Sequence, residues 1–179
     1  MKKRINVKSL TIAALMIALS IILGQIKVFQ MPQGGSVTLF GLLPIVVLGY
    51  LMGTRIGLLG GLGSGLLQLL FGGYVIHPIQ LILDYILATC CLGLSGLVRN
   101  KHNGLTKGYL IGITCKYICA VISGWVFFGS YAPENFNALL WSLFYNITYI
   151  GAEGIITVVL LNIPVVKKTF LKIRNSIEN

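Results

Sequence analysis

The chain has 179 residues, of which 56% are hydrophobic and only 10% are charged. About a quarter of the residues of a typical soluble domain are charged, and disordered chains combine low hydrophobicity with high charge, so the composition excludes both classes. The net charge of +10 comes from 14 Lys and Arg residues against 4 Asp and Glu residues. These cations lie between long apolar runs and form no basic patch on a polar face, which argues against nucleic-acid binding. The composition is that of an integral membrane protein.

Six apolar segments follow one another along the chain, and a helix needs about 20 such residues to cross a bilayer. They are Ser9–Phe29, Val37–Met52, Ile56–Phe71, Pro78–Val98, Lys107–Phe128 and Ala138–Val166. Only Gly53-Thr54-Arg55 separates the second segment from the third, but one helix over both would be far longer than a bilayer requires. The sequence therefore predicts an all-α membrane protein, a single integral domain over residues 1–179 with six transmembrane helices.

The distribution of the cations predicts that both termini are cytoplasmic. In that orientation all Lys and Arg residues except Lys27 and Lys116 lie on the inner side, as the positive-inside rule requires. They are Lys2, Lys3, Arg4, Lys8, Arg55, Arg99, Lys101, Lys107, Lys167, Lys168, Lys172 and Arg174. The first apolar run is long and has no small-residue cleavage site, so it is predicted to be an uncleaved span and not a signal peptide.

Small residues form two regular patterns. Gly53, Gly57, Gly61 and Gly65 recur every four residues and so share one helix face, which lets helix backbones approach closely in lipid. Internal packing is the favoured interpretation of this face. Ala14 and Ala18 form a second smooth patch, for which internal packing and docking to another membrane subunit are equally favoured.

No motif predicts a metal site, a cofactor or nucleotide hydrolysis. The glycine-rich stretch Gly57–Gly65 is not followed by the Lys-Ser or Lys-Thr pair of a phosphate-binding loop. The four cysteines lack the two-residue spacing of zinc or redox pairs and lie in apolar surroundings. Uphill transport by this chain would therefore need an ion gradient or an energising partner.

Three ionisable residues, Asp84, Lys116 and Glu153, lie within the predicted spans. A charge near the bilayer centre costs at least about 2.5–3.5 kcal/mol, so such residues usually face a bundle interior or mark a substrate path. A structural ion pair of Lys116 with either carboxylate is an equally favoured interpretation for Lys116 and Glu153.

Aromatic and polar residues gather near Asp84 at the outer ends of the spans. They are Tyr74, His77, Tyr85, Trp125, Phe127, Phe128, Tyr131, Trp141, Tyr145 and Asn146. A carboxylate framed by aromatic faces attracts a flat organic cation through charge and cation–π interactions. This pattern predicts an outward-facing site for a small aromatic cation.

Four segments of the sequence resemble the thiamine transporter ThiT/YuaJ family. They are MPQGGSV at Met31–Val37, HPIQLILDY at His77–Tyr85, FFGSYAP at Phe127–Pro133 and YNITY at Tyr145–Tyr149. The resemblance runs through nearly the whole chain in order. It implies a substrate-binding S component of an energy-coupling factor (ECF) transporter in the bacterial plasma membrane, working with one membrane T component and two ATPases.

The resemblance also implies roles for particular residues. The predicted thiamine site consists of Tyr74, Asp84, Tyr85, Gly124, Phe128, Trp141 and Asn146. Asp84 takes the place of the acidic residue that holds the aminopyrimidine. A lid is implied between the first two helices, with Pro32, Gly34, Gly35 and Ser36. Ala14 and Ala18 match an Ala-x-x-x-Ala patch that docks on the T component.

Two positions depart from the family pattern. Ala120 stands where the family has a histidine against the thiazolium ring, and Trp141 replaces a tyrosine. Three alternatives to a thiamine-binding S component therefore stay open: the same architecture with a thiamine precursor or another vitamin as ligand, a small membrane enzyme using Asp84, Lys116 and Glu153, and a stand-alone ion-coupled carrier. The depths of the three ionisable residues differ, which argues against the enzyme.

Overall fold

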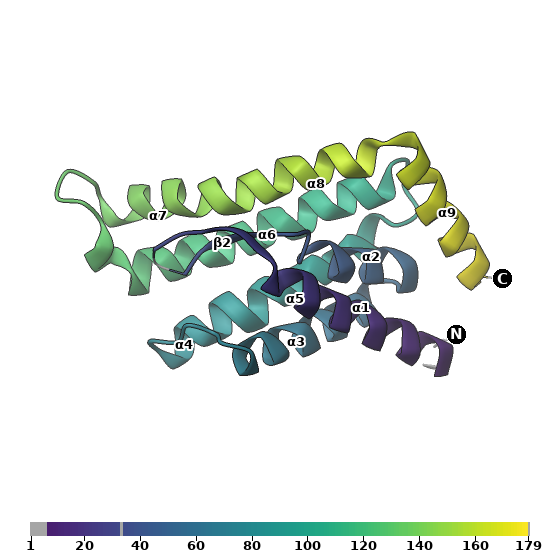
Figure 1. Cartoon of the computed structure of the whole chain (residues 1–179), viewed down its shortest axis with the longest axis horizontal. Coiled ribbons are helices and arrows are strands. Elements are labelled where there is room, and N and C mark those ends of the chain that lie inside the picture. Colours follow the sequence, from purple (N-terminus) through teal and green to yellow (C-terminus); the bar gives the residue numbers. More distant parts are fainter. Residues whose placement is uncertain (1–6, 33, 179) are drawn as a thin grey trace.

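The computed structural model describes residues 7–32 and 34–178 and is almost entirely helical. Some residues used in the predictions lie outside the described residues. They are Lys2, Lys3 and Arg4, which entered the prediction of orientation, and Gln33, which lies in the segment of the predicted lid. Most helices run along the length of the molecule, and a short β-hairpin extends from its middle toward the end where α4 (Pro78–Leu81) and α7 (Ala138–Asn146) lie (Figure 1). The beginning of α1 (Val7–Gln25) lies at the same end of the bundle as α9 (Pro164–Glu178), whereas α4 lies at the opposite end.

Three helices of the described chain are long and apolar enough to cross a membrane, and they match three predicted spans. One is an irregular helix over Pro78–Val98, which combines α4, a π-helical segment η1 (Ile82–Leu87), α5 (Ala88–Leu92) and a 3-10 segment η2 (Gly93–Val98). The second is α6 (Gly104–Phe127). The third combines α7 (Ala138–Asn146), the π-helical η4 (Ile147–Gly151) and α8 (Ala152–Asn162).

The last of these helices ends at Asn162, and the prediction that it reaches Val166 is wrong. Ile163 leaves the helix in an extended conformation, and Pro164 then opens α9, where its fixed φ suits a first helical turn. Arg174 of α9 donates hydrogen bonds to the Arg99 carbonyl and the Asn100 side chain, and its guanidinium lies 5.3 Å from the ring centroid of Tyr50. The C-terminal helix is therefore fixed to the end of the bundle.

The predicted boundaries of the first two spans are also wrong. Helix α1 ends at Gln25, and β1 (Lys27–Gln30) pairs antiparallel with β2 (Ser36–Thr38). Helix α2 (Leu43–Met52) begins only after a turn in which Phe40 has a φ of +60°. Gly34, with a φ of +93°, lies in the hairpin loop, where a helix cannot continue.

Helix α2 is a core helix enclosed by protein. Its ten residues span about 15 Å, half the hydrocarbon thickness of a bilayer. Every residue from Pro44 to Leu51 is buried, and Ile45, Val46 and Leu48 are fully inaccessible to solvent. The apolar character of α2 therefore matches its burial inside the bundle.

The helix face that carries the regularly spaced glycines packs against other helices inside the protein, as predicted. Gly53, with a φ of +90°, ends helix α2 and separates it from α3 (Thr54–Leu70). A Cβ atom on Gly61 would lie 2.4 Å from the carbonyl oxygen of Thr89, and one on Gly65 would lie 2.1 Å from that of Tyr85. Only glycine allows α3 to approach the backbone of the Pro78–Val98 helix so closely.

We expect Gly61→Ala to destabilise the protein, because its methyl group would meet rigid backbone atoms of Thr89 and Cys90. Overpacking of this kind costs about 1–3 kcal/mol. The melting temperature of the purified protein in detergent should therefore fall by several degrees. Gly24→Ala is the matched control, since a Cβ there meets nothing within 4 Å. Equal melting temperatures for the two variants would contradict the packing.

Candidate functional site

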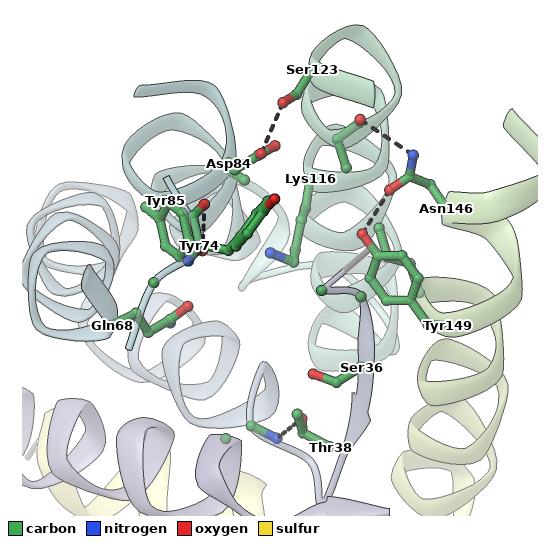
Figure 2. A pocket seen from close by; sticks show the side chains of 18 of the residues that line it. Ser36, Thr38, Gln68, Tyr74, Asp84, Tyr85, Lys116, Ser123, Asn146 and Tyr149 are labelled. Atoms are coloured by element: carbon green, nitrogen blue, oxygen red, sulfur yellow. Dashed lines mark hydrogen bonds between the residues drawn. The ribbon is translucent and has the colours of Figure 1, made fainter. Parts of the chain in front are cut away.

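A cavity of about 270 Å³ lies between the hairpin, α1, the end of α3 and the three long helices. All seven residues predicted to bind the ligand line this cavity. They are Tyr74, Asp84, Tyr85, Gly124, Phe128, Trp141 and Asn146. Figure 2 shows Asp84, Tyr74 and Tyr85 on one side and Asn146 and Tyr149 on the other. The structure thus brings together residues that are up to 72 positions apart in the sequence, from Tyr74 to Asn146.

The predicted lid residues lie beside the same cavity, with one exception. Gly34, Gly35 and Ser36 line it, whereas Pro32 is exposed in the hairpin loop and is not part of the wall. Ala14 and Ala18 lie outside the cavity on an exposed face of α1, together with Leu15 and Leu19. Of the two interpretations of this alanine pair, internal packing is wrong for the described chain.

Asp84 is held in a fixed orientation by two neighbouring side chains. Gln80 Nε2 donates a hydrogen bond of 2.7 Å to Asp84 Oδ2, and Ser123 Oγ donates one of 2.8 Å to the same oxygen. Asp84 lies in the π-helical segment η1, and wide turns of this type often occur at functional sites. The carboxylate is therefore positioned by the Pro78–Val98 helix and by α6 together.

Gln80 connects this carboxylate to the loop before the helix. Its side chain is 1% exposed, donates to the carbonyl of Tyr74 at 3.1 Å and accepts from the amide of Ile76 at 3.2 Å. The hydroxyl of Tyr85 accepts a further hydrogen bond of 2.7 Å from the Tyr74 amide. His77 is the N-cap of the helix, and its Nδ1 accepts a hydrogen bond from the amide of Ile79.

Aromatic rings form two groups along the wall. On one side, the ring centroids of Tyr74 and Tyr131 each lie 6.1 Å from that of Phe128. On the other, the rings of Trp141, Tyr145 and Tyr149 follow one another at 6.0 Å. Rings on both sides of a half-buried carboxylate suit a flat cationic ligand.

The amide of Asn146 is engaged within the protein. Its Nδ2 donates to Ser142 and to the carbonyl of Ala120, and its Oδ1 accepts a 2.6 Å hydrogen bond from the hydroxyl of Tyr149. The Tyr149 ring also lies against Gly35, because a Cβ on Gly35 would be 2.6 Å from Tyr149 Cε1. Tyr149 thus contacts the hairpin and the predicted ligand residue Asn146 at once.

Lys116 points into the cavity (Figure 2). Within the described part of the chain, its ammonium has no carboxylate oxygen within the 4.0 Å of an ion pair, so the structural pair with Asp84 or Glu153 is wrong. Glu153 also lines the cavity, but it accepts hydrogen bonds from Thr38 and Leu42 instead.

Sequence reasoning missed Gln80, Ser123 and Tyr149. Gln80 precedes Asp84 by four residues, a spacing that places both on one helix face, so the sequence contained that signal. Ser123 is 39 residues from Asp84 in the chain. Only the packing of two helices reveals their contact.

The fold and this site define a class: a multi-pass membrane protein with a small-molecule cavity enclosed by long apolar helices and capped by a hairpin. Comparisons with known proteins identify the family. The profile of the Thiamine transporter protein family (Thia_YuaJ) matches residues 10–173, and the chain belongs to this family. It is a family of transporters of the bacterial cell membrane and not of enzymes.

Individual relatives support the assignment. The chain is 39% identical to the thiamine transporter ThiT of Bacillus subtilis over 164 residues, which covers 83% of this chain and 85% of the relative. It is 36% identical to the thiamine transporter ThiT of Lacticaseibacillus paracasei over 124 residues, or 60% and 62% of the two chains. A solved structure of ThiT from Listeria monocytogenes superposes with a TM-score of 0.77 at 26% identity, covering 93% of this chain and 97% of that one.

We expect Gln80→Leu to destabilise the protein, because the leucine fills the space but makes none of the hydrogen bonds to Tyr74, Ile76 and Asp84. Burying unsatisfied polar groups costs about 1–3 kcal/mol, and a loss of about 2 kcal/mol corresponds to about 4–8 °C in a chain of this size. Thermal unfolding followed by circular dichroism measures the change. Gln25→Leu is the control, because Gln25 is exposed and makes a single bond of 3.4 Å; a similar effect of both variants would contradict the role of Gln80.

Proposed function

We propose that the chain is the substrate-binding S component of an ECF transporter, which captures thiamine outside the cell and delivers it inward. The observation that carries this proposal is the cavity in which Asp84, oriented by Gln80 and Ser123, faces aromatic rings from two sides. Thiamine is a flat organic cation, so the carboxylate supplies the opposite charge and the rings supply stacking surfaces. The thiamine transporters among the relatives support this ligand.

In this proposal Asp84 holds the aminopyrimidine and offsets the charge of the thiazolium. Tyr74, Tyr85, Phe128 and Trp141 frame the rings, Gly124 contacts the ligand, and Asn146 supplies directional hydrogen bonds. Tyr149 joins this set, because it lies between Asn146 and the hairpin. Residues Gly34 to Ser36 form the part of the lid that covers the cavity.

The proposed topology has six passages in one membrane domain with both ends in the cytoplasm. α1, α3 and the three long helices supply five passages, and the segment 36–42 with α2 supplies the other. Arg99 and Arg174 meet at the end of the bundle where α9 lies, which the positive-inside rule assigns to the cytoplasm. The hairpin and the cavity then face the exterior.

We expect Asp84→Asn to keep the fold and weaken thiamine binding by about 10–100-fold. The amide can still accept from Gln80 and Ser123, but it lacks the negative charge, and hydrogen bonds to charged groups contribute about 1.5–3 kcal/mol. Quenching of Trp141 fluorescence, since Trp141 lines the cavity, measures the affinity. Hydroxymethylpyrimidine and riboflavin serve as competitors to test the alternative ligands.

Glu134→Gln is the matched control, because it removes one carboxylate charge from an exposed loop position. Its thiamine affinity should equal that of the unmodified protein. Unchanged affinity of Asp84→Asn would overturn the proposed site, and tighter binding of a competitor than of thiamine would overturn the proposed ligand.

The proposal includes two ATPases and a T component, and the T component docks on the exposed face of α1 at Ala14 and Ala18. We expect Ala14→Trp/Ala18→Trp to abolish thiamine uptake into proteoliposomes that contain the energising module, while thiamine binding by the isolated protein stays unchanged. The reason is steric, since two indole rings would prevent the close approach that small residues allow.

Ile155→Trp is the control for this experiment, because Ile155 is 69% exposed on another helix. It should transport normally. Uptake by the chain alone, in vesicles without ATPases, would support the stand-alone carrier and contradict the S component.

A further inference from the structure

Glu153 is a buried carboxylate that the proposed thiamine contacts do not use. It lies in the first turn of α8 and is 3% exposed. Its Oε2 accepts hydrogen bonds from the amide of Thr38 at 2.9 Å and from the Thr38 hydroxyl at 2.8 Å. Its Oε1 accepts from the amide of Leu42 at 3.4 Å. Both oxygens therefore bind one segment, Thr38–Leu42, which connects the hairpin to α2.

This segment is a tight turn that closes around the carboxylate. The Thr38 hydroxyl accepts a hydrogen bond of 3.1 Å from the amide of Gly41, and Ser20 donates one of 2.7 Å to the Gly41 carbonyl. Phe40 adopts the left-handed conformation, which is unfavourable by about 1–2 kcal/mol for a residue with a side chain. An anion that accepts several backbone N–H groups at the start of a helix offsets this cost.

Tyr149, four residues before Glu153 on the same helix, makes a second contact with the hairpin. Tyr149 packs its ring against Gly35, the residue before β2, and Glu153 binds Thr38 at the end of β2, so the α7–α8 helix contacts the chain on both sides of the strand. Residues four apart lie on one side of a helix, which explains how one helix can follow the strand. Thr38 lies at the foot of the hairpin strand in Figure 2, and Ser36 lies nearer the cavity.

We infer that Glu153 is a positioning residue that fastens the lid to the α7–α8 helix and thereby sets the rate at which a bound ligand leaves. With Thr38 fixed, Gly34, Gly35 and Ser36 stay over the cavity. The inference rests on the proposed function, because it concerns release of the ligand from that site. Since Glu153 also lines the cavity, the competing explanation is direct attraction between its charge and a cationic ligand.

Substitutions of Thr38 distinguish the two explanations, because the Thr38 hydroxyl donates a hydrogen bond to Glu153 but carries no charge. Glu153→Gln replaces one acceptor oxygen by an N–H group that faces donors, and Thr38→Val removes the hydroxyl donor while keeping the shape. We expect each variant to raise the dissociation rate constant of thiamine by about tenfold, the size expected for one hydrogen bond to a charged group. The association rate constant should change by less than about twofold.

The double variant should release thiamine no faster than the faster single variant, since both changes break the same contact. Thr38→Ser keeps the hydroxyl and should restore slow release. Glu134→Gln is the control for loss of a carboxylate, because Glu134 is exposed in a loop. Stopped-flow tryptophan fluorescence measures both rate constants. If Glu153→Gln does not fold, Thr38→Val and Thr38→Ser decide the question by themselves.

Faster release in Glu153→Gln with unchanged release in Thr38→Val would show direct charge attraction and overturn the inference, as would unchanged release in both. Amide hydrogen exchange of residues 34–42 in the ligand-free protein gives a second readout. Faster exchange in both variants supports the anchor, and unchanged exchange overturns it. A protein that binds no thiamine would refute the proposed function, and the exchange measurement would still decide the role of Glu153.

Discussion

The carboxylate of Asp84 organises the half of the molecule that contains the cavity. Its Oδ2 accepts hydrogen bonds from Gln80 on its own helix and from Ser123 on α6, so the two helices must keep a fixed distance and rotation at this level. Gln80 also donates a hydrogen bond to the carbonyl of Tyr74 and so fixes the backbone there. The ring of Tyr74 consequently lies beside that of Phe128 at the cavity. A buried charge is expensive in a membrane, and this network together with an accessible cavity is what makes it tolerable.

The α7–α8 helix links the proposed ligand site to the hairpin. Asn146, Tyr149 and Glu153 follow one another at intervals of three and four residues and so share one side of the helix. Tyr149 bonds to Asn146 and packs on Gly35, while Glu153 binds Thr38. These contacts connect Asn146 to the hairpin through Tyr149, and Glu153 joins the same helix to Thr38.

Much of this architecture could be predicted from the sequence, and the failures have physical causes. The three long helices are evident as apolar runs of sufficient length, and the glycine spacing revealed the packing face of α3. The enclosure of α2 was missed, because an apolar segment buried by protein has the composition of one buried by lipid. The hairpin was missed, because Val28 and Phe29 of the exposed strand β1 extend the apolar run of α1. The predicted residues do share one cavity, but the contacts Ser123–Asp84 and Thr38–Glu153 join positions 39 and 115 residues apart, which no local pattern encodes.

The enclosure of α2 has a consequence for how the protein is made. A helix of ten residues is too short to partition into lipid by itself, and its ends would leave backbone groups unsatisfied in the hydrocarbon. Tyr109 and Ile113, which belong to the same hydrophobic core, are synthesised some sixty residues later. During translation α2 must therefore be shielded by the insertion machinery or by α1 and α3 until α6 has been synthesised and the core can form around it.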